Sequence, residues 1–178
     1  MIELRTGDII FVMHHDNFLS KTIARAMGSK WSHSAIVYGN TNGRALLCET
    51  SDFEVTLNWF DRYVKDENVS LEVYRHGNYY NIIQGNEEAI QEMCDSILGK
   101  MYGYLQLISL GIRRLCKLRI PNFIYSGLVC CHVVGYGLNV IKDSGFDGID
   151  PESFDTEEMY QMIKSKGWIE IFRKERKL

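Results

Sequence analysis

Residues 31–50, WSHSAIVYGNTNGRALLCET, predict two β-strands joined by a tight turn. Residues 31–39 are rich in β-branched and aromatic side chains, which favour strands. The Asn42-Gly43 pair is typical of a β-hairpin turn, so residues 44–50 form the expected return strand. This hairpin predicts that the chain builds an antiparallel sheet.

Two polar residues of the hairpin stand out against their apolar neighbours. His33 and Glu49 each end a short apolar row on their own strand. Antiparallel pairing would bring the imidazole and the carboxylate onto one face of the sheet. Each residue alone also has a plainer explanation, because a histidine on an apolar strand is more often a core residue and a glutamate can simply lie on an edge strand.

The rest of the chain predicts more strands and a helical layer. Short β-rich runs predict strands, and helical spacing of apolar residues predicts helices. The expected strands lie at residues 8–13, 53–57, 70–75 and 168–172, and the expected helices at residues 18–27, 87–98, 101–115 and 155–164. Strands come first, helices follow and a strand closes the chain. This order predicts an α+β fold in which an antiparallel β-sheet packs against helices.

Residues 126–141, SGLVCCHVVGYGLNVI, predict one further helix that carries two adjacent cysteines near its start. Ser126 is the expected N-cap. Cys130 heads a core-facing apolar stripe, whereas Cys131 lies about 100° around the helix. The positive end of the helix dipole favours thiolate over thiol, which suits a nucleophile at Cys130. The alternative is a packing cysteine, because free cysteine behaves as a small hydrophobe.

Length and composition limit the classes of protein. A chain of 178 residues predicts a single domain, residues 1–178, with its own core. The formal net charge of −3 provides no basic surface, so no nucleic-acid partner is expected. Five cysteines without a CxxC pair argue against a disulfide framework or a zinc ribbon, and no metal or cofactor is expected.

The N-terminal residues and the longest apolar run indicate a location. The N-terminus, MIELRTGDIIFV, lacks the basic region and apolar core of a secretory signal, so a cytoplasmic location is expected. Residues 101–116 are interrupted by polar side chains and fall short of the roughly 20 residues that span a bilayer. Stable membrane insertion is therefore not expected.

Together, His33, Glu49 and Cys130 supply the groups needed for nucleophilic acyl transfer. The histidine acts as the base for the thiol, the carboxylate orients the other ring nitrogen, and the helix N-terminus offers backbone donors where an oxyanion develops.

The order of these motifs resembles that of the permuted NlpC-type papain-like cysteine hydrolases, in their YiiX/YebB-like branch. The matching segments are residues 7–11 (GDIIF), 28–37 (GSKWSHSAIV), 48–50 (CET), 99–104 (GKMYGY), 130–134 (CCHVV) and 149–151 (IDP). Circular permutation would explain why His33 precedes Cys130, the reverse of the order in papain. The resemblance implies one papain-like cysteine hydrolase domain over residues 1–178, with Cys130 as nucleophile, His33 as base and Glu49 as orienting residue.

The resemblance leaves several alternatives. Family members usually have Cys-Ser at the nucleophile where this chain has Cys130-Cys131, so either thiol could act. An alignment on Tyr125 would instead imply an inactive binding module. Relatives act on cell-wall peptides or lipid amides and esters, so the expected substrate is a peptide, a peptidoglycan fragment or a lipid amide. An acyltransferase or thioesterase of the lecithin:retinol acyltransferase-like type is the second enzymatic alternative, and the oligomeric state is left open.

The other chemically interesting residues receive structural interpretations. His76 and His132 are expected at the surface, and Tyr63 is expected to pack within a short helix or turn. Cys48, Cys94 and Cys116 are expected to be packing residues.

Overall fold

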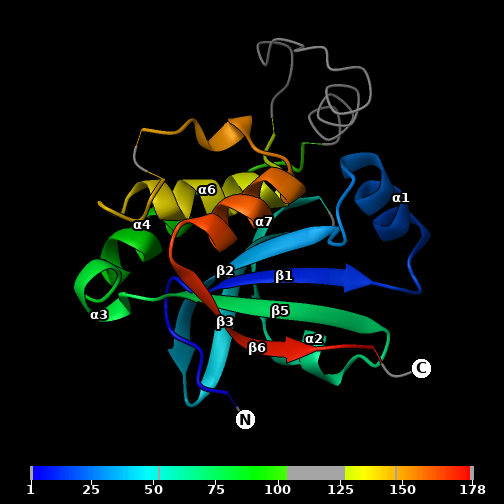
Figure 1. Cartoon of the computed structure of the whole chain (residues 1–178), viewed down its shortest axis with the longest axis horizontal. Coiled ribbons are helices and arrows are strands. Elements are labelled where there is room, and N and C mark those ends of the chain that lie inside the picture. Colours follow the sequence, from blue (N-terminus) through cyan, green and yellow to red (C-terminus); the bar gives the residue numbers. More distant parts are fainter. Residues whose placement is uncertain (1, 52, 104–126, 147, 177–178) are drawn as a thin grey trace.

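The computed structural model describes residues 2–51, 53–103, 127–146 and 148–176. Its centre is a six-stranded antiparallel sheet in the order β4-β3-β2-β1-β5-β6 (Figure 1). The strands are β1 (Ile9–His14), β2 (His33–Thr41), β3 (Arg44–Ser51), β4 (Glu54–Trp59), β5 (Val69–His76) and β6 (Trp168–Lys174). The predicted α+β class with an antiparallel sheet is therefore confirmed.

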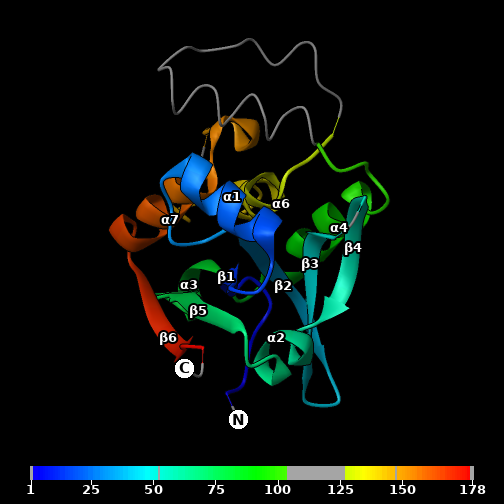
Figure 2. The ribbon, with the colours of Figure 1, turned by 90° about the vertical axis from the view of Figure 1, so that its right-hand side faces the viewer.

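Helices cover both faces of this sheet. They are α1 (Phe18–Met27), α2 (Asp61–Lys65), α3 (Tyr79–Ile82), α4 (Glu87–Ile97), α6 (Cys130–Asn139), the 3-10 turn η2 (Pro151–Ser153) and α7 (Thr156–Ser165). Apolar residues of α4, α6 and α7 pack with one sheet face in the larger core, and α2 contributes to a second core on the opposite face. Figure 2 shows α6 and α2 on opposite sides of the sheet.

The hairpin that starts the sheet forms as predicted. β2 pairs antiparallel with β3, and Ile36 faces Cys48 in the register. A β-bulge between Val37 and Gly39 shifts the register nearer the turn. The first helix is confirmed as well, because α1 ends at Met27 and is followed by Gly28, whose φ of 60° is the left-handed conformation of a C-cap.

The start of the cysteine helix differs from the prediction. The helix α6 begins at Cys130, and its N-cap is Val129, which provides no side-chain cap; Ser126 lies outside the described residues. The chain before Cys130 is instead held by backbone pairing, since the Leu128 N–H donates to the Met101 carbonyl and the Gly103 N–H donates to the Leu128 carbonyl. A helix cannot form where these groups bond to another segment.

Residues 101–103, at the start of the helix predicted for residues 101–115, are not helical. Met101 and Tyr102 form isolated β-bridges with Glu54 and Leu128, respectively, so the helix does not begin at Met101. Residues 104–115 lie outside the described residues, as does Cys116. Among the helices that the structure describes, none has the length and apolar character needed to cross a bilayer.

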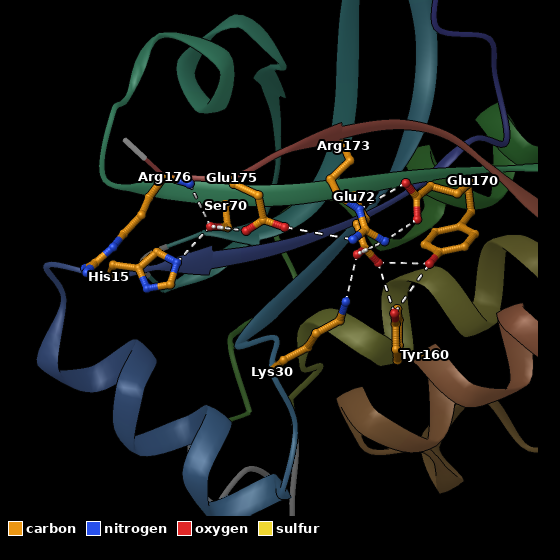
Figure 3. A network of polar contacts seen from close by, with 10 residues as sticks. His15, Lys30, Ser70, Glu72, Tyr160, Glu170, Arg173, Glu175 and Arg176 are labelled. Carbon is orange, nitrogen blue, oxygen red and sulfur yellow. Dashed lines mark hydrogen bonds and ion pairs between the residues drawn. The ribbon is translucent and has the colours of Figure 1, made fainter. Parts of the chain in front are cut away.

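A buried carboxylate on β5 ties several elements together. Glu72 has no exposed side-chain surface, and its Oε1 forms ion pairs with Lys30 at 2.7 Å and Arg173 at 2.8 Å. Its Oε2 accepts hydrogen bonds from Tyr74 at 2.9 Å and Tyr160 at 3.0 Å. Figure 3 shows Lys30, Arg173 and Tyr160 converging on this carboxylate. The segment before β2, the sheet and α7 are thereby joined around one charge.

Candidate active site

Cys130 occupies the first position of α6 and is 3% exposed. Its thiol lies 4.0 Å from the Thr156 hydroxyl, at the first residue of α7. A backbone N–H of Ser34 on β2 also interacts with the sulfur. The thiol therefore sits where the starts of two helices meet the start of β2.

His33 and Glu49 form a direct pair on the hairpin. Because Ile36 faces Cys48, the register places residues 33 and 49 diagonally across two neighbouring strands, within reach of long side chains. The distance from His33 Nε2 to Glu49 Oε2 is 2.7 Å. The expectation that the hairpin brings these two groups onto one face is confirmed. Since Nε2 is engaged by the carboxylate, Nδ1 is the ring nitrogen left to exchange a proton with a thiol.

The electrostatics of the pair extend to the thiol. Burial disfavours the imidazolium form of His33, but hydrogen bonds to Cys130 and Glu49 outweigh it and raise the pKa of His33 to about 10. The pKa of Cys130 is lowered well below its ordinary value by the adjacent Cys131 thiol and by the hydrogen bond and charge of His33, against the effect of burial. This arrangement favours a thiolate beside an imidazolium.

The two adjacent cysteines are distinguished by their partners. Cys131 is as buried as Cys130, although it lies on a different side of the helix. The segment before α7 covers that side of α6, and the Cys131 thiol donates to the Phe154 carbonyl at 3.2 Å. Burial raises the pKa of Cys131 well above its ordinary value. Cys130, by contrast, interacts with His33.

Two residues of α2 complete the surroundings of Glu49. The Tyr63 hydroxyl donates to Glu49 Oε2 at 2.6 Å, and the guanidinium of Arg62 lies 3.1 Å from Glu49 Oε1. Tyr63 is fully buried, as expected for a packing residue, but its hydroxyl also bonds the carboxylate. The sequence contains an Arg-Tyr pair at these positions but no signal that links it to a glutamate thirteen residues earlier.

The carboxylate is ionised in this setting. Burial raises the pKa of Glu49, but the hydrogen bond and charge of His33, the charge of Arg62 and the hydrogen bond of Tyr63 together hold it below its ordinary value. Glu49 can therefore keep His33 Nε2 protonated and fix the orientation of the ring.

A pocket of ≈ 240 Å³ lies beside this cluster. Its walls combine polar and apolar side chains from several elements. They include Leu19, His33, Thr50, Arg62, Tyr63 and Tyr102. A pocket of this kind can hold a small acyl group next to the imidazole.

His76 and His132 differ from their expected positions at the surface. His132 is completely buried on α6 and His76 is 7% exposed, so the surface prediction is wrong for both. His76 lies against the Trp168 ring, with centroids 5.2 Å apart, because β6 pairs beside β5. Cys48 and Cys94 are free and buried, as predicted for packing residues.

Metal-ligating side chains are not clustered in the part of the chain that the structure describes. Within residues 2–51, 53–103, 127–146 and 148–176, no group of three or more His, Cys, Asp or Glu side chains is arranged to hold a metal ion. These residues do not fit a metal centre of that type.

Comparisons with known proteins find similarity at the level of structure. No family model matches the sequence, and no curated protein matches it. Among solved structures, the chain is similar to yiiX from Escherichia coli O157:H7, which is described as a metalloprotein. The TM-score is 0.55, with 15% sequence identity over 97% of this chain and 99% of that chain. At this level of identity, the similarity shows that the chain shares the fold of yiiX.

Proposed function

We propose that the protein is a cysteine hydrolase with a circularly permuted papain-like arrangement, which cleaves an amide, peptide or related acyl bond through an acyl-enzyme on Cys130. The observation that carries the proposal is the bond of 2.7 Å between His33 and Glu49, with Cys130 as the thiol that interacts with the same imidazole. Base, orienting carboxylate and helix-terminal thiol are the three parts of a nucleophilic acyl-transfer site.

The first half of the reaction forms a thioester. The Cys130 thiolate attacks the acyl carbon, a C–S bond forms, and the carbonyl electron pair moves to oxygen. The N-terminus of α6 directs backbone N–H groups and a positive partial charge toward the developing oxyanion. The intermediate then collapses, the carbon–leaving-group bond breaks, and the proton on His33 Nδ1 passes to the departing amine or alcohol.

The second half restores the enzyme. Neutral His33 takes a proton from water as the oxygen attacks the thioester carbon. The C–S bond breaks, the acid product leaves, and Cys130 returns to the thiolate beside protonated His33. Throughout both halves, Glu49 keeps the Nε2 proton in place and compensates the positive charge of the ring.

The pocket supports a substrate whose acyl portion is small or partly apolar. Leu19 and Ile23 of α1 provide apolar surface, and Thr50 and Ser51 of β3 provide hydroxyls. The candidates remain a peptide, a peptidoglycan fragment or a lipid amide.

Acylation by p-nitrophenyl acetate tests the proposal directly. The purified protein should release p-nitrophenol and gain one acetyl group, which peptide mapping should place on Cys130. Cys130→Ala should abolish both results, whereas Cys94→Ala, which removes a buried free thiol on α4, serves as the control and should retain them. Equal turnover by Cys130→Ala, or acetylation mapped to another residue, would overturn the proposal.

A further inference from the structure

Glu49 is held by more groups than a triad requires. Its side chain has no exposed surface, and each of its oxygens has a partner on α2. Oε2 accepts from both His33 at 2.7 Å and Tyr63 at 2.6 Å, and Oε1 faces Arg62 at 3.1 Å. Rotation of the carboxylate away from His33 would therefore break two further interactions.

The direction of the hydrogen bonds in this cluster is fixed. The Arg62 guanidinium donates to the Tyr63 hydroxyl oxygen at 2.8 Å. A guanidinium has no acceptor, so the single hydroxyl proton of Tyr63 is directed to Glu49. The chain of donors runs from Arg62 to Tyr63 to Glu49, and His33 donates to the same Oε2 atom of Glu49.

The charges of the cluster balance when the site is ready to react. The imidazolium of His33 and the thiolate of Cys130 cancel, as do Arg62 and Glu49. Without Arg62, the buried cluster would carry one net negative charge. A nearby negative charge disfavours the thiolate form of Cys130 and favours the protonated form of His33.

We infer that Tyr63 and Arg62 are positioning residues for the reaction of Cys130: Tyr63 fixes the orientation of Glu49 against His33, and Arg62 balances the charge of Glu49. The inference rests on the proposed function, since it assigns these residues a role at the same site. Both residues contact Glu49, and both act through it.

The Glu72 cluster provides an internal comparison. Glu72 is equally buried, pairs with Arg173 and accepts a hydrogen bond from Tyr74, but its remaining cation is Lys30 rather than a histidine beside a thiol. Figure 3 shows that this second carboxylate is surrounded by Lys30, Arg173 and Tyr160. Tyr74→Phe is therefore the matched control for Tyr63→Phe, because each removes one hydroxyl bonded to a buried glutamate.

The test compares Tyr63→Phe, Tyr74→Phe, Arg62→Gln and Arg62→Lys with the wild-type protein. For each, the rate of Cys130 alkylation by iodoacetamide is measured from about pH 5 to pH 10 with peptide mapping, alongside p-nitrophenyl acetate turnover. Thermal unfolding of each variant gives the cost in stability. Alkylation requires no substrate, so it reports on the thiolate even if no hydrolysis occurs.

We expect Tyr63→Phe to lower the rate of Cys130 alkylation near pH 6 about tenfold, because a hydrogen bond to a charged group is lost. Tyr74→Phe should change this rate less than twofold. Arg62→Gln should raise the apparent pKa of Cys130 alkylation by about 0.5 to 1, whereas Arg62→Lys should keep it near the wild-type value. If Tyr63→Phe does not fold, the comparison of Arg62→Gln with Arg62→Lys decides the inference.

Equal effects of Tyr63→Phe and Tyr74→Phe, or identical pH profiles for Arg62→Gln and Arg62→Lys, would overturn the inference. Selective alkylation of Cys130 without acetylation or turnover would contradict the proposed function and leave the positioning role decided by the pH profiles.

Discussion

His33 and Glu49, on neighbouring strands of one hairpin, approach to 2.7 Å between Nε2 and Oε2. The pair is built by the register of β2 and β3, so its geometry depends on backbone pairing more than on flexible side chains. The carboxylate is completely buried and the imidazole side chain is 16% exposed. The ring can therefore reach a substrate while its partner stays out of water.

Replacing Glu49 with glutamine tests the role of the carboxylate charge. Glu49→Gln keeps the shape but removes the charge that helps to hold the pKa of His33 at about 10. We expect the pKa of His33 to fall and turnover of p-nitrophenyl acetate to drop roughly tenfold or more. An NMR titration of His33 measures the first effect, and an unchanged titration would show that Glu49 does not act on the ring.

The pH dependence of the reaction follows from the two shifted groups. The lowered pKa of Cys130 keeps the thiolate present into the acidic range, and the raised pKa of His33 keeps the imidazolium present until about pH 10. The reactive ion pair is lost by protonation of the thiolate at low pH and by deprotonation of the ring as pH approaches 10. Turnover measured against pH should show a broad plateau between these limits, whereas a rise centred near pH 9 would indicate an ordinary thiol.

The Glu72 cluster should affect stability more than chemistry. Its cations are about half exposed, so Glu72→Gln is expected to cost about 1–3 kcal/mol in the free energy of unfolding. Urea denaturation measures this cost, and Cys130 alkylation of the folded variant should stay close to the wild-type rate. If Glu72→Gln unfolded at the same urea concentration as the wild-type protein, the assigned stabilising role of Glu72 would be contradicted.

This cluster also predicts a loss of stability in acid. Burial raises the pKa of Glu72, but its hydrogen bonds to Lys30, Tyr74 and Tyr160 outweigh burial and lower it below the unfolded value of 4.5. The contribution to stability is therefore present above pH 4.5 and is lost as pH falls through the folded-state pKa. The difference in unfolding free energy between wild type and Glu72→Gln should shrink in that range, and a constant difference would argue against an ionised Glu72.

Gly127 controls the approach of the chain to Cys130. Its φ is 141°, and a Cβ there would lie 2.7 Å from the Gly103 Cα. Gly127→Ala should cost about 1–3 kcal/mol in unfolding free energy, more than Gly99→Ala, because Gly99 has a positive φ but open space around its Cβ position. Equal costs in urea denaturation would show that the contact with Gly103 is unimportant.

Much of the sheet was predictable because local signals agree with the final structure. The Asn42-Gly43 turn and the alternation on either side predict both strands and their pairing, and these in turn place His33 near Glu49. Asp155 and Glu158 form the predicted capping box of α7. In each case the interacting residues are close in sequence.

The features that the sequence did not predict depend on contacts between distant segments. Leu128 pairs with residues 101–103, and α6 therefore starts only at Cys130. Cys131 is buried because residues before α7 fold back over α6, and Tyr63 reaches Glu49 from a separate helix. No periodicity within one segment encodes such contacts.

Selective alkylation of Cys130 decides whether this thiol is the activated nucleophile. Wild-type protein is treated with iodoacetamide near pH 6, and the modified cysteines are mapped by mass spectrometry, with His33→Ala treated in parallel. We expect Cys130 to react faster than Cys48, Cys94 and Cys131, and we expect this preference to disappear in His33→Ala. Slow and uniform labelling of all cysteines in the wild-type protein, or an unchanged preference for Cys130 in His33→Ala, would contradict this expectation.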